Sequence, residues 1–476
     1  MIRNWLSRYS FRYPRAIVYM LQASEYNLRD YFAWYHNVKN FANVEQRKQF
    51  VKTAKGTLLL VIAWIFIFFI VCFSSLILWF GTFPLKYILA AITLLVAPYL
   101  LAYGITVPLF VIRIFIQLPV EYFLIKQARR RLKNHKAVKI GVAGSFGKTT
   151  MREILRTVLA EGKNAVAPPH SYNTPLGISQ FVKKLSGREE VLIFELGEYY
   201  PGDVRKLCNL VQPDIGVITG INEAHLQKFK ELGRTAKTIY ELADYLQGKP
   251  IYVNGESEIA LENARPGHTI YSRKGIENWK VKNEKSDLNG TLFTLTGNGE
   301  LSLKSGLLGL HQIGPLLVAF HISSALGLSH EQIKKGIEKT RPFEHRLEPK
   351  IDGTGVITLD DTYNGNPDGV KAAVEFLGSL KAHRRFYVTP GLVEMGSHTE
   401  KVHRDIGRNL ARACIEKVVL IKNSVTHYIE QGLKEEKYGG EILWFDNALV
   451  AFAALPYLTV KGDIVLLQND WPDQYQ

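Results

Sequence analysis

The stretch Gly141-Val-Ala-Gly-Ser-Phe-Gly-Lys-Thr-Thr150 decides how the middle of this chain folds. Residues 137–143 (AVKIGVA) are apolar and β-branched, which is typical of a buried strand. Residues 151–160 (MREILRTVLA) place apolar side chains at helical spacing. A glycine-rich turn between a strand and a helix predicts a phosphate-binding loop, in which backbone N–H groups and the helix N-terminus face phosphate oxygens.

Two side chains of this loop have expected chemical tasks. Lys148 would reach the β- and γ-phosphates of a nucleotide, and the Thr149 hydroxyl would bind Mg²⁺. We expect the rest of the loop to line the nucleotide: Gly144, Ser145, Phe146, Gly147 and Thr150. Val142 departs from the general pattern, which has a glycine five residues before Gly147. A glycine-rich turn that merely precedes a lysine is the alternative, and the flanking strand and helix favour nucleotide binding.

The composition excludes some classes of protein. With 476 residues the chain has room for two or three domains. Its three cysteines lie far apart without metal-ligand spacing, which fits a reducing compartment and provides no disulfide framework. The net charge of +15 indicates an anionic partner. Because no stripe of Lys and Arg alternates with aromatic residues, we expect no nucleic acid, and a membrane surface explains the charge better.

Residues 57–112 contain two uncharged apolar runs. The first, residues 57–80, is long enough to cross a bilayer and is apolar all round. The second, residues 87–112, is interrupted by Pro98, Gly104 and Pro108, which predicts a kink. We therefore expect a transmembrane helical hairpin, and a buried hairpin in a soluble domain is the alternative.

Basic residues flank the hairpin on both sides, whereas the turn between the runs offers only Lys86. The positive-inside rule then places both ends, and the domains that follow, in the cytoplasm, as in a multi-pass protein of the cytoplasmic membrane. The cluster after the hairpin would also bind anionic lipid headgroups. It comprises Lys126, Arg129, Arg130, Arg131, Lys133 and Lys136. Ahead of the hairpin, the aromatic and basic residues 1–56 could form interfacial helices, with a role left open.

Residues 137–341 alternate short apolar runs with helical patterns, which predicts an α/β domain with a mainly parallel sheet. Glu195 ends a buried-type strand, where ligands gather in open α/β sheets, so it could hold a metal or simply be a hydrogen-bonded strand-end acid. By its spacing alone, His225 after the next strand is more often structural than a ligand, and Lys237 would pass as a surface lysine. Alternating patterns in residues 251–308 predict hairpins at an edge of the domain.

The last segment, residues 342–476, predicts a second and smaller α/β domain. Its first strand ends in Asp360 and Asp361 and opens into an Asn/Gly/Pro loop. A basic juxtamembrane linker, residues 113–136, would connect the hairpin to the first α/β domain. A site between two α/β domains suits a reaction that joins two substrates.

Several of these stretches together resemble the Mur ligases, the ATP-dependent amide-forming enzymes of peptidoglycan synthesis. Residues 144–150 match the phosphate loop of that family, including its lack of a glycine at Val142. Residues 171–177 (SYNTPLG) are similar to its Asn-rich loop, and residues 194–203 and 222–226 to its segments with a metal-binding glutamate and histidine. The resemblance covers residues 137–465. It is greatest to the branch that adds D-alanyl-D-alanine to a UDP-linked muramoyl tripeptide.

The resemblance implies roles for single residues. Lys237 falls where the family has a carbamylated lysine, so Glu195, His225 and Lys237 would hold Mg²⁺, two ions in all with Thr149. Catalysis would rest on Lys148, Glu195, His225 and Lys237. The nucleotide-clamping and hinge motifs correspond to Arg346, Asp360, Asp361 and Asn364. The fold implied is a phosphate-loop ATPase domain followed by a Rossmann-like C-terminal domain.

Three departures accompany the resemblance. Gln312 and Pro315 replace both asparagines of the adenine-contact segment. Residues 468–470 (QND) stand near the usual position of a Lys-Gly-Ser-Arg type loop. The family's UDP-binding N-terminal domain has no counterpart in this sequence, where the two apolar runs stand in its place.

The expected activity is ATP-dependent ligation. A muramyl-peptide carboxylate would be activated as an acyl phosphate and attacked by D-alanyl-D-alanine or a similar amine. A different or lipid-linked acceptor, in a poly-γ-glutamate-like or amidation reaction, is one alternative. A non-catalytic nucleotide-binding scaffold for cell-wall enzymes is another.

Overall fold

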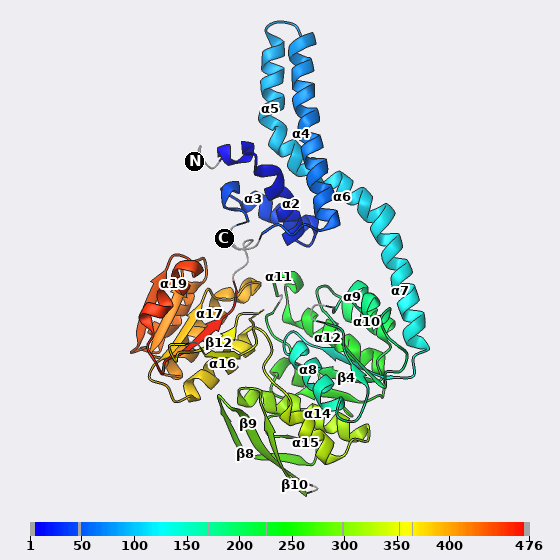
Figure 1. Ribbon diagram of the computed structural model, residues 1–476, viewed down its shortest axis with the longest axis vertical. Coiled ribbons are helices and arrows are strands. Elements are labelled where there is room, and N and C mark those ends of the chain that lie inside the picture. Colours follow the sequence, from blue (N-terminus) through cyan, green and yellow to red (C-terminus); the bar gives the residue numbers. More distant parts are fainter. Residues whose placement is uncertain are drawn as a thin grey trace. The chain divides into compact units, whose positions relative to one another are not determined.

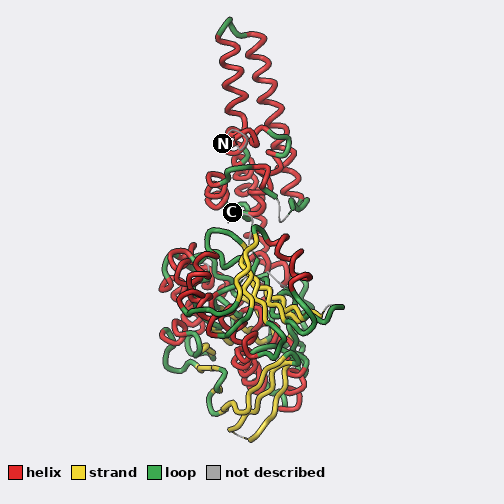
Figure 2. Tube along the Cα trace, turned by 90° about the vertical axis from the view of Figure 1, so that its left-hand side faces the viewer, coloured by secondary structure: helices red, strands yellow, loops and turns green. Residues whose placement is uncertain are grey.

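The computed structural model describes residues 5–45, 49–169, 172–224, 226–297, 299–351, 353–363 and 365–470. His225 and Asn364, both expected in the site, lie outside these ranges. The chain divides into two compact units, residues 1–123 and residues 124–471. Figures 1 and 2 show a helical first unit and a second unit built on sheets.

The first unit is a helical hairpin whose base packs against short helices. The hairpin consists of α4 (Ala54–Phe80) and α5 (Leu85–Gly104), followed by α6 (Thr106–Ile112) and the π-helical turn η3 (Arg113–Gln117). By length and composition, α4 and the helical run from Leu85 to Lys133 could each cross a membrane. The short elements ahead of them are η1 (Ser7–Tyr9), α2 (Tyr13–Ala23), α3 (Leu28–Asn37) and η2 (Phe41–Asn43).

The aromatic residues of the first unit form its core. Tyr13, Tyr31 and Tyr35 are buried together with Leu59 of α4 and Leu101 of α5. Tyrosine hydroxyls of this core bond backbone carbonyls of α5, the helix that contains Pro98. Tyr13 donates to the Pro98 carbonyl at 2.9 Å, and Tyr31 donates to the Ala102 carbonyl at 2.9 Å. These aromatic side chains therefore pack inside the unit.

The second unit contains a ten-stranded and a six-stranded sheet. The larger sheet has the order β10-β9-β8-β7-β6-β5-β4-β1-β3-β2. Its strands are β1 (Val138–Ala143), β2 (Ala165–Val166), β3 (Val191–Glu195), β4 (Ile215–Ile218), β5 (Ile251–Asn254), β6 (Thr269–Ser272), β7 (Gly275–Ile276), β8 (Trp279–Asp287), β9 (Gly290–Gly297) and β10 (Gly299–Ser305). β1 lies between β3 and β4 in parallel register, with Val142 opposite Glu195 and Val217. The phosphate loop thus leaves the middle of the parallel region.

Helices cover both faces of the larger sheet, and two apolar clusters fill the spaces beneath them. They are α8 (Lys148–Leu159), α9 (Pro175–Val182), α10 (Asp203–Val211), α11 (Leu226–Phe229), α12 (Leu232–Leu246), α13 (Glu258–Glu262), α14 (Ile313–Ala325), which follows the short turn η4 (Leu310–Gln312), and α15 (His330–Glu338). The expected hairpins form at one edge, where β6 to β10 pair antiparallel. β5 corrects that expectation: it pairs parallel with both β4 and β6, because the chain crosses over through α13.

The six-stranded sheet has the order β11-β12-β16-β13-β14-β15. Its strands are β11 (Glu348–Ile351), β12 (Ile357–Asp361), β13 (Arg385–Thr389), β14 (Lys417–Ile421), β15 (Glu441–Phe445) and β16 (Ile464–Gln468). Its helices are α16 (Pro367–Ser379), α17 (Thr399–Arg412), α18 (Thr426–Glu435) and α19 (Ala448–Leu458), with the short turn η5 (Gly396–His398) before α17. α16, α17 and α18 cover one face of this sheet, whereas α19 packs against the other.

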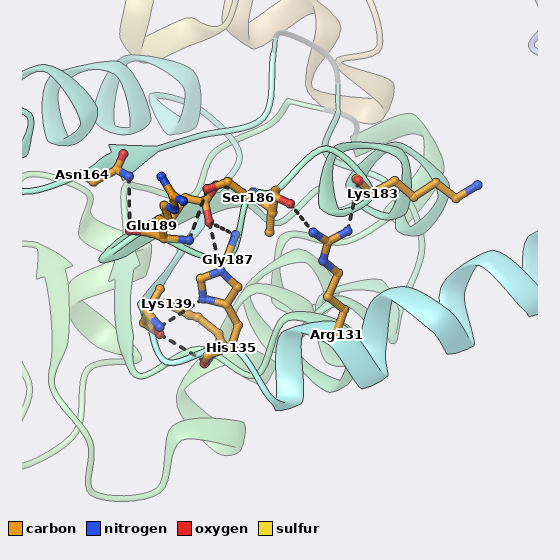
Figure 3. Close-up of polar contacts among 11 residues, drawn as sticks. Arg131, His135, Lys139, Asn164, Lys183, Ser186, Gly187 and Glu189 are labelled. Atoms are coloured by element: carbon orange, nitrogen blue, oxygen red, sulfur yellow. Dashed lines mark hydrogen bonds and ion pairs between the residues drawn. The ribbon is translucent and has the colours of Figure 1, made fainter.

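α7 (Leu118–Lys133) begins in the first unit and ends docked on the ten-stranded sheet's domain. Ala128 and Leu132 are buried among the apolar residues of that domain. Arg131, expected among the lipid-binding residues, instead donates to the carbonyls of Lys183, at 3.0 Å, and Leu185 (Figure 3). The expected juxtamembrane linker is therefore largely helical, and its last turns belong to the folded domain.

Just beyond α7, His135 lies 3.1 Å from a carboxylate oxygen of Glu189 (Figure 3). The Ala137 N–H donates to Nδ1 of His135, so the ring proton is on Nε2 and faces Glu189. Glu189 also accepts from the backbone N–H groups of Ser186, at 2.7 Å, and Gly187, at 2.8 Å. This network fixes the chain immediately before β1.

Candidate active site

The loop between β1 and α8 is shaped by its glycines. Gly144 has a φ of +147° and Gly147 a φ of +75°, which side-chain-bearing residues rarely adopt. The Ser145 N–H donates to the Gly220 carbonyl at 2.8 Å, and the Thr219 hydroxyl donates to the carbonyls of Ala143 and Phe146. The loop is therefore held from the neighbouring strand β4, with its backbone in a conformation that can enclose an anion.

Lys148 lies at the first position of α8 with its side chain largely buried. Its Nζ donates to the Gly144 carbonyl across the loop and to Oε1 of Glu198 at 2.9 Å. Glu198 is 3% exposed and comes from the segment after β3. Reasoning from the sequence missed this partner, although Glu198 lies only three residues beyond Glu195.

Glu195, at the end of β3, is bound from the first turns of α8. The Thr149 hydroxyl donates to its Oε2 at 3.2 Å, and Nη1 of Arg152 lies 2.9 Å from its Oε1. Arg152 is 1% exposed and was also missed. A signal was present, because Arg152 follows Thr149 by three residues and so shares its helix face.

Several polar atoms around the loop are buried without a hydrogen-bond partner among the described residues. They are Oγ of Ser145, Oε2 of Glu198, Oε1 of Glu195, which has only the ion pair with Arg152, and, on the facing domain, Nε of Arg346. Buried polar atoms of proteins are almost always hydrogen-bonded, so atoms left over here fit a site that completes its bonds with a ligand. Thr149 and Glu195 add hydroxyl and carboxylate oxygens, the donors that Mg²⁺ prefers. The residues present thus fit one Mg²⁺ and a nucleotide.

The domain of the six-stranded sheet contributes Arg346. Its guanidinium lies 5.1 Å from the ring centroid of Tyr363, a cation–π distance. Burial lowers the pKa of Arg346, whereas the negative charges of Asp361 and Glu195 act in the opposite direction. Arg346 therefore lies within electrostatic range of the Glu195 carboxylate of the other domain.

Asp360 and Asp361 are buried at the end of β12 but have different surroundings. Burial raises the pKa of Asp360, yet hydrogen bonds from Lys350, Thr362 and His345 outweigh it and hold this pKa below its usual value. Burial raises the pKa of Asp361, with Arg346 opposing. Asp360 is thus engaged within its own domain, and Asp361 is the acid beside Arg346.

The end of β16 supports this acid. Gln468 donates to Oδ2 of Asp361 at 2.6 Å. Asn469 accepts from the Gly365 N–H at 3.0 Å and donates to the Gly391 carbonyl. Gln468 and Asn469, at the positions where the family usually has a basic loop, therefore bond the end of β12 and the loop that follows it.

The two sheet domains contact each other beside the site. Nδ2 of Asn222, in the loop after β4, donates to Oδ1 of Asn366 at 3.0 Å and to Oδ2 of Asp368 at 2.7 Å. Asn366 caps the N-terminus of α16. Nearby, Glu223 lies 3.3 Å from Nδ1 of His398. The loop after β4 is thus tied to the start of α16.

Lys237 is exposed on α12, between the buried residues Ala236 and Thr238. Among the described residues, no group of three or more His, Cys, Asp or Glu could hold a metal ion. The structure therefore brings Lys148, Thr149 and Glu195 together, whereas the side chain of Lys237 is exposed to solvent and His225 is outside the described ranges.

The replaced adenine segment forms the turn before α14. Nε2 of Gln312 lies 2.7 Å from Nε2 of His311. Burial lowers the pKa of His311 to about 4, so the ring is neutral at pH 7 and accepts this bond. Oε1 of Gln312 is buried with no hydrogen-bond partner in the part of the chain that the structure describes. Pro315 lies in the first turn of α14 and offers no N–H.

Comparison with protein families finds two matches. The Mur ligase middle domain matches residues 142–323, and the Mur ligase glutamate ligase domain matches residues 345–468. The two matches correspond to the domains of the ten-stranded and the six-stranded sheet.

Relatives and solved structures agree with these matches. The UDP-N-acetylmuramoyl-tripeptide–D-alanyl-D-alanine ligase of Mycobacterium tuberculosis is 27% identical over 354 residues, covering 69% of each chain. The Bacillus subtilis protein of the same name is 26% identical, covering 64% of this chain and 72% of its own. The fold is similar to that of the MurF ligase of Thermotoga maritima in complex with ADP, with a TM-score of 0.65, 22% identity and coverage of 74% and 80%. MurF from Acinetobacter baumannii gives a TM-score of 0.64 at 21% identity, covering 73% and 77%.

Proposed function

This chain belongs to the Mur ligase family, and we propose that it is an ATP-dependent ligase of peptidoglycan precursor synthesis that joins an amine to a muramyl-peptide carboxylate. The relatives named for adding D-alanyl-D-alanine to a UDP-linked muramoyl tripeptide suggest that dipeptide as the amine. One observation carries the proposal: Lys148, Thr149 and Glu195 converge at the phosphate loop while Arg346 of the second domain lies within electrostatic range of Glu195.

Forming an amide from a free carboxylate is uphill in water, so the acid must first be activated. In the proposed reaction the γ-phosphoryl group of ATP passes to the carboxylate, and the amine then displaces phosphate from the acyl phosphate. Such a transfer needs positioning and charge neutralisation more than covalent chemistry from the protein. Lys148 supplies a positive charge over the loop, and the backbone from Phe146 to Thr149 would supply N–H donors.

Thr149 and Glu195 would hold one Mg²⁺. When bound, this ion would neutralise charge on the nucleotide phosphates. Arg152 keeps the Glu195 carboxylate oriented toward Thr149 through an ion pair with its other oxygen. Roles for His225 and a carbamylated Lys237 at a second ion remain part of the proposal. The side chain of Lys237 is exposed to solvent on α12.

The second domain would hold the nucleotide and exclude water. Arg346 lies beside Asp361 and near Glu195, and its Nε has no hydrogen-bond partner among the described residues. A guanidinium there suits the charge that develops on a transferring phosphoryl group. Asp360 and the loop that contains Asn364 would form the hinge, since Asp360 links β11 to β12 through Lys350. Closure keeps water from hydrolysing the acyl phosphate.

We further propose that α4 and α5 cross the cytoplasmic membrane and that the ligase domains lie on its cytoplasmic side. The two candidate spans and the flanking basic residues support this arrangement. It also makes a lipid-linked muramyl peptide the second candidate acceptor, because the enzyme would work beside the bilayer. The soluble UDP-linked precursor is the first candidate, by likeness to the relatives.

The experiment uses the full chain in detergent micelles with Mg²⁺-ATP, D-alanyl-D-alanine and a muramyl-tripeptide acceptor. The acceptor is supplied once in its UDP form and once lipid-linked, and products are identified by mass spectrometry. A dipeptide adduct on either acceptor supports the ligase, and the preferred form identifies the acceptor. ATP binding without any adduct or acceptor-dependent ADP release would contradict it and favour a non-catalytic scaffold.

A further inference from the structure

α19 differs from the other helices of its domain in its outer face. Residues 447–460 (NALVAFAALPYLTV) contain no charged side chain. The outward side is apolar along its whole length: Leu449, Phe452, Ala453 and Pro456 form a stripe at helical spacing, with Val450 and Tyr457 beside it, and all six are exposed. Leu449 is 78% exposed and Tyr457 is 91% exposed. A helix that is apolar all round is normally buried, so this face lacks the polar surface that water favours.

The inner side of α19 already covers its sheet. Ala451 is buried against Val419 of β14 and Val465 of β16, and Leu455 and Leu458 pack around it. The N-terminus of the helix is capped by Asn447, which accepts from the Val450 N–H at 2.9 Å. The helix is therefore well formed. Its packing on the sheet uses only the inner side, so this packing does not account for the exposed apolar stripe.

α17, on the opposite face of the same sheet, follows the usual rule. Its inner side chains Val402, Ile406 and Leu410 are buried. Its outer side carries arginines that pair with acids at the end of α18, such as Arg404 with Glu435 at 2.8 Å, and just beyond it, such as Arg412 with Glu436 at 2.7 Å. One domain thus has a charged helix surface on one face and an uncharged apolar one on the other.

We propose that the outer face of α19 is a membrane-contact surface, by which the C-terminal domain rests in the interfacial region of the bilayer. The inference rests on the proposed membrane anchoring by α4 and α5. It adds a second attachment point, on the domain of the six-stranded sheet. Its partner is the lipid bilayer itself.

Three observations favour the bilayer as the occupant. The chain carries its own candidate spans. α7, about 24 Å long at 1.5 Å per residue, connects the apolar region directly to the ligase domains. This short connection tethers the ligase domains to the membrane that the spans would cross. The exposed face of α19 contains leucine, valine and phenylalanine and no charged residue, as does the buried face of interfacial helices. Tyr457 and Lys461 follow at its C-terminal end, the residue types that lie at headgroup level.

The test places a fluorescent label at single positions of the full chain in liposomes that contain anionic lipid. Cys208 and Cys414 are replaced by alanine and serine, and Cys72 in α4 serves alone as the label site for the spans. Further variants replace Cys72 as well and carry Leu449→Cys or Tyr457→Cys. The matched control is Lys434→Cys, an exposed position on α18 across the sheet. Quenching by a nitroxide lipid and by aqueous iodide is measured for each.

We expect labels at positions 449 and 457 to be quenched several-fold more by the nitroxide lipid than the label at 434, and to be shielded from iodide. Ala453→Glu should reduce lipid quenching at 457, whereas Lys434→Glu should leave it unchanged. Equal access of iodide to positions 449, 457 and 434 would overturn the proposal.

The same labels distinguish the bilayer from a second copy of the chain, and the contact surface from the anchoring. Shielding that disappears at a low protein-to-lipid ratio would assign the face to a second copy and also overturn the proposal. Lipid quenching at Cys72 without quenching at 449 would reject the contact surface and leave the anchoring intact. Quenching at neither position would contradict the anchoring itself.

Discussion

At the scale of single residues, the candidate site consists of paired positive and negative side chains around the phosphate loop. Lys148 pairs with Glu198, and Arg152 pairs with Glu195, so these two cations of α8 each have a carboxylate from the end of β3 or just beyond it. A nucleotide phosphate that enters the loop would compete with Glu198 for Lys148. The Glu195–Arg152 pair, by contrast, leaves Oε2 of Glu195 directed at Thr149. Lys148 is thus positioned to exchange its contact with Glu198 for one with the nucleotide. The Arg152–Glu195 pair is positioned to hold Glu195 in place for a ligand.

Lys148→Ala should lower the rate of ligation on the order of 10²–10³-fold, because it removes a donor from the transferring phosphates. The domain should remain folded, since the lysine side chain lies at the mouth of the loop rather than in the apolar core. Acceptor-dependent ADP release measures the rate, and circular dichroism measures the fold. Lys163→Ala, which removes an exposed lysine paired with Glu190, is the control and should keep full activity. A folded Lys148→Ala protein with normal turnover would refute the assignment of the loop.

Arg152→Met should destabilise the protein by about 3–5 kcal/mol, because it leaves the Glu195 carboxylate buried without its partner. Arg156→Met removes an exposed arginine from the same helix and should cost less than about 1 kcal/mol. Thermal unfolding of the full chain in micelles compares the two. Equal midpoints would show that the buried pair does not stabilise the site.

At the scale of elements, the end of α7 and the turn before β1 are both held by contacts with the same segment, residues 183–189. Arg131 caps the carbonyls that end the α9 segment, and His135 and Glu189 close the turn. β1 then leads directly into the phosphate loop. A substitution that destabilises this junction is therefore expected to affect the phosphate loop through β1.

The Glu189 network predicts a dependence on pH. Burial alone would raise the pKa of Glu189, but hydrogen bonds from Ser186, the neighbouring backbone and His135 hold it at about 2. Because this pKa lies below the ordinary value of 4.5, the ionised group stabilises the fold fully above pH 4.5 and progressively less as the pH falls toward 2. Glu189→Gln should cost about 1–3 kcal/mol at pH 7 and flatten this acid dependence. Thermal midpoints measured between pH 7 and pH 2 check it, and an unchanged slope would count against the network.

At the scale of the whole second unit, the site needs both sheet domains. The loop after β4 and the start of α16 meet through Asn222, Asn366 and Asp368, beside the positions expected to bind substrate. Ligation must keep water away from the activated acid, so contacts that hold the domains together affect the fate of the acyl phosphate as much as its formation.

Asn222→Ala should therefore uncouple the reaction. It removes both hydrogen bonds to α16, so we expect the ratio of ADP released to amide formed to rise several-fold while the KM for ATP changes little. Asn263→Ala, in the exposed turn after α13, is the control and should leave the ratio near one. A ratio that stays near one in both variants would show that the contact has no part in closure.

Local patterns alone were enough to predict much of this protein. The strand, loop and helix around Lys148, the two apolar runs, the edge hairpins and the second α/β domain all follow from periodicity, glycine positions and charge, which act between residues close in sequence. Those signals also place Thr149 and Glu195, because strand ends and helix starts meet at one edge of a parallel sheet.

Only the tertiary structure decided the partners. That Glu198 faces Lys148, that Arg152 holds Glu195 and that Arg346 lies near Glu195 depends on which strands and domains pack together, over separations that no local pattern encodes. The exposure of Lys237 and the docking of Arg131 likewise depend on which helix face the neighbouring elements cover. Spacing along the chain selects the side chains available to a site, but burial and electrostatics in the packed fold determine which of them meet.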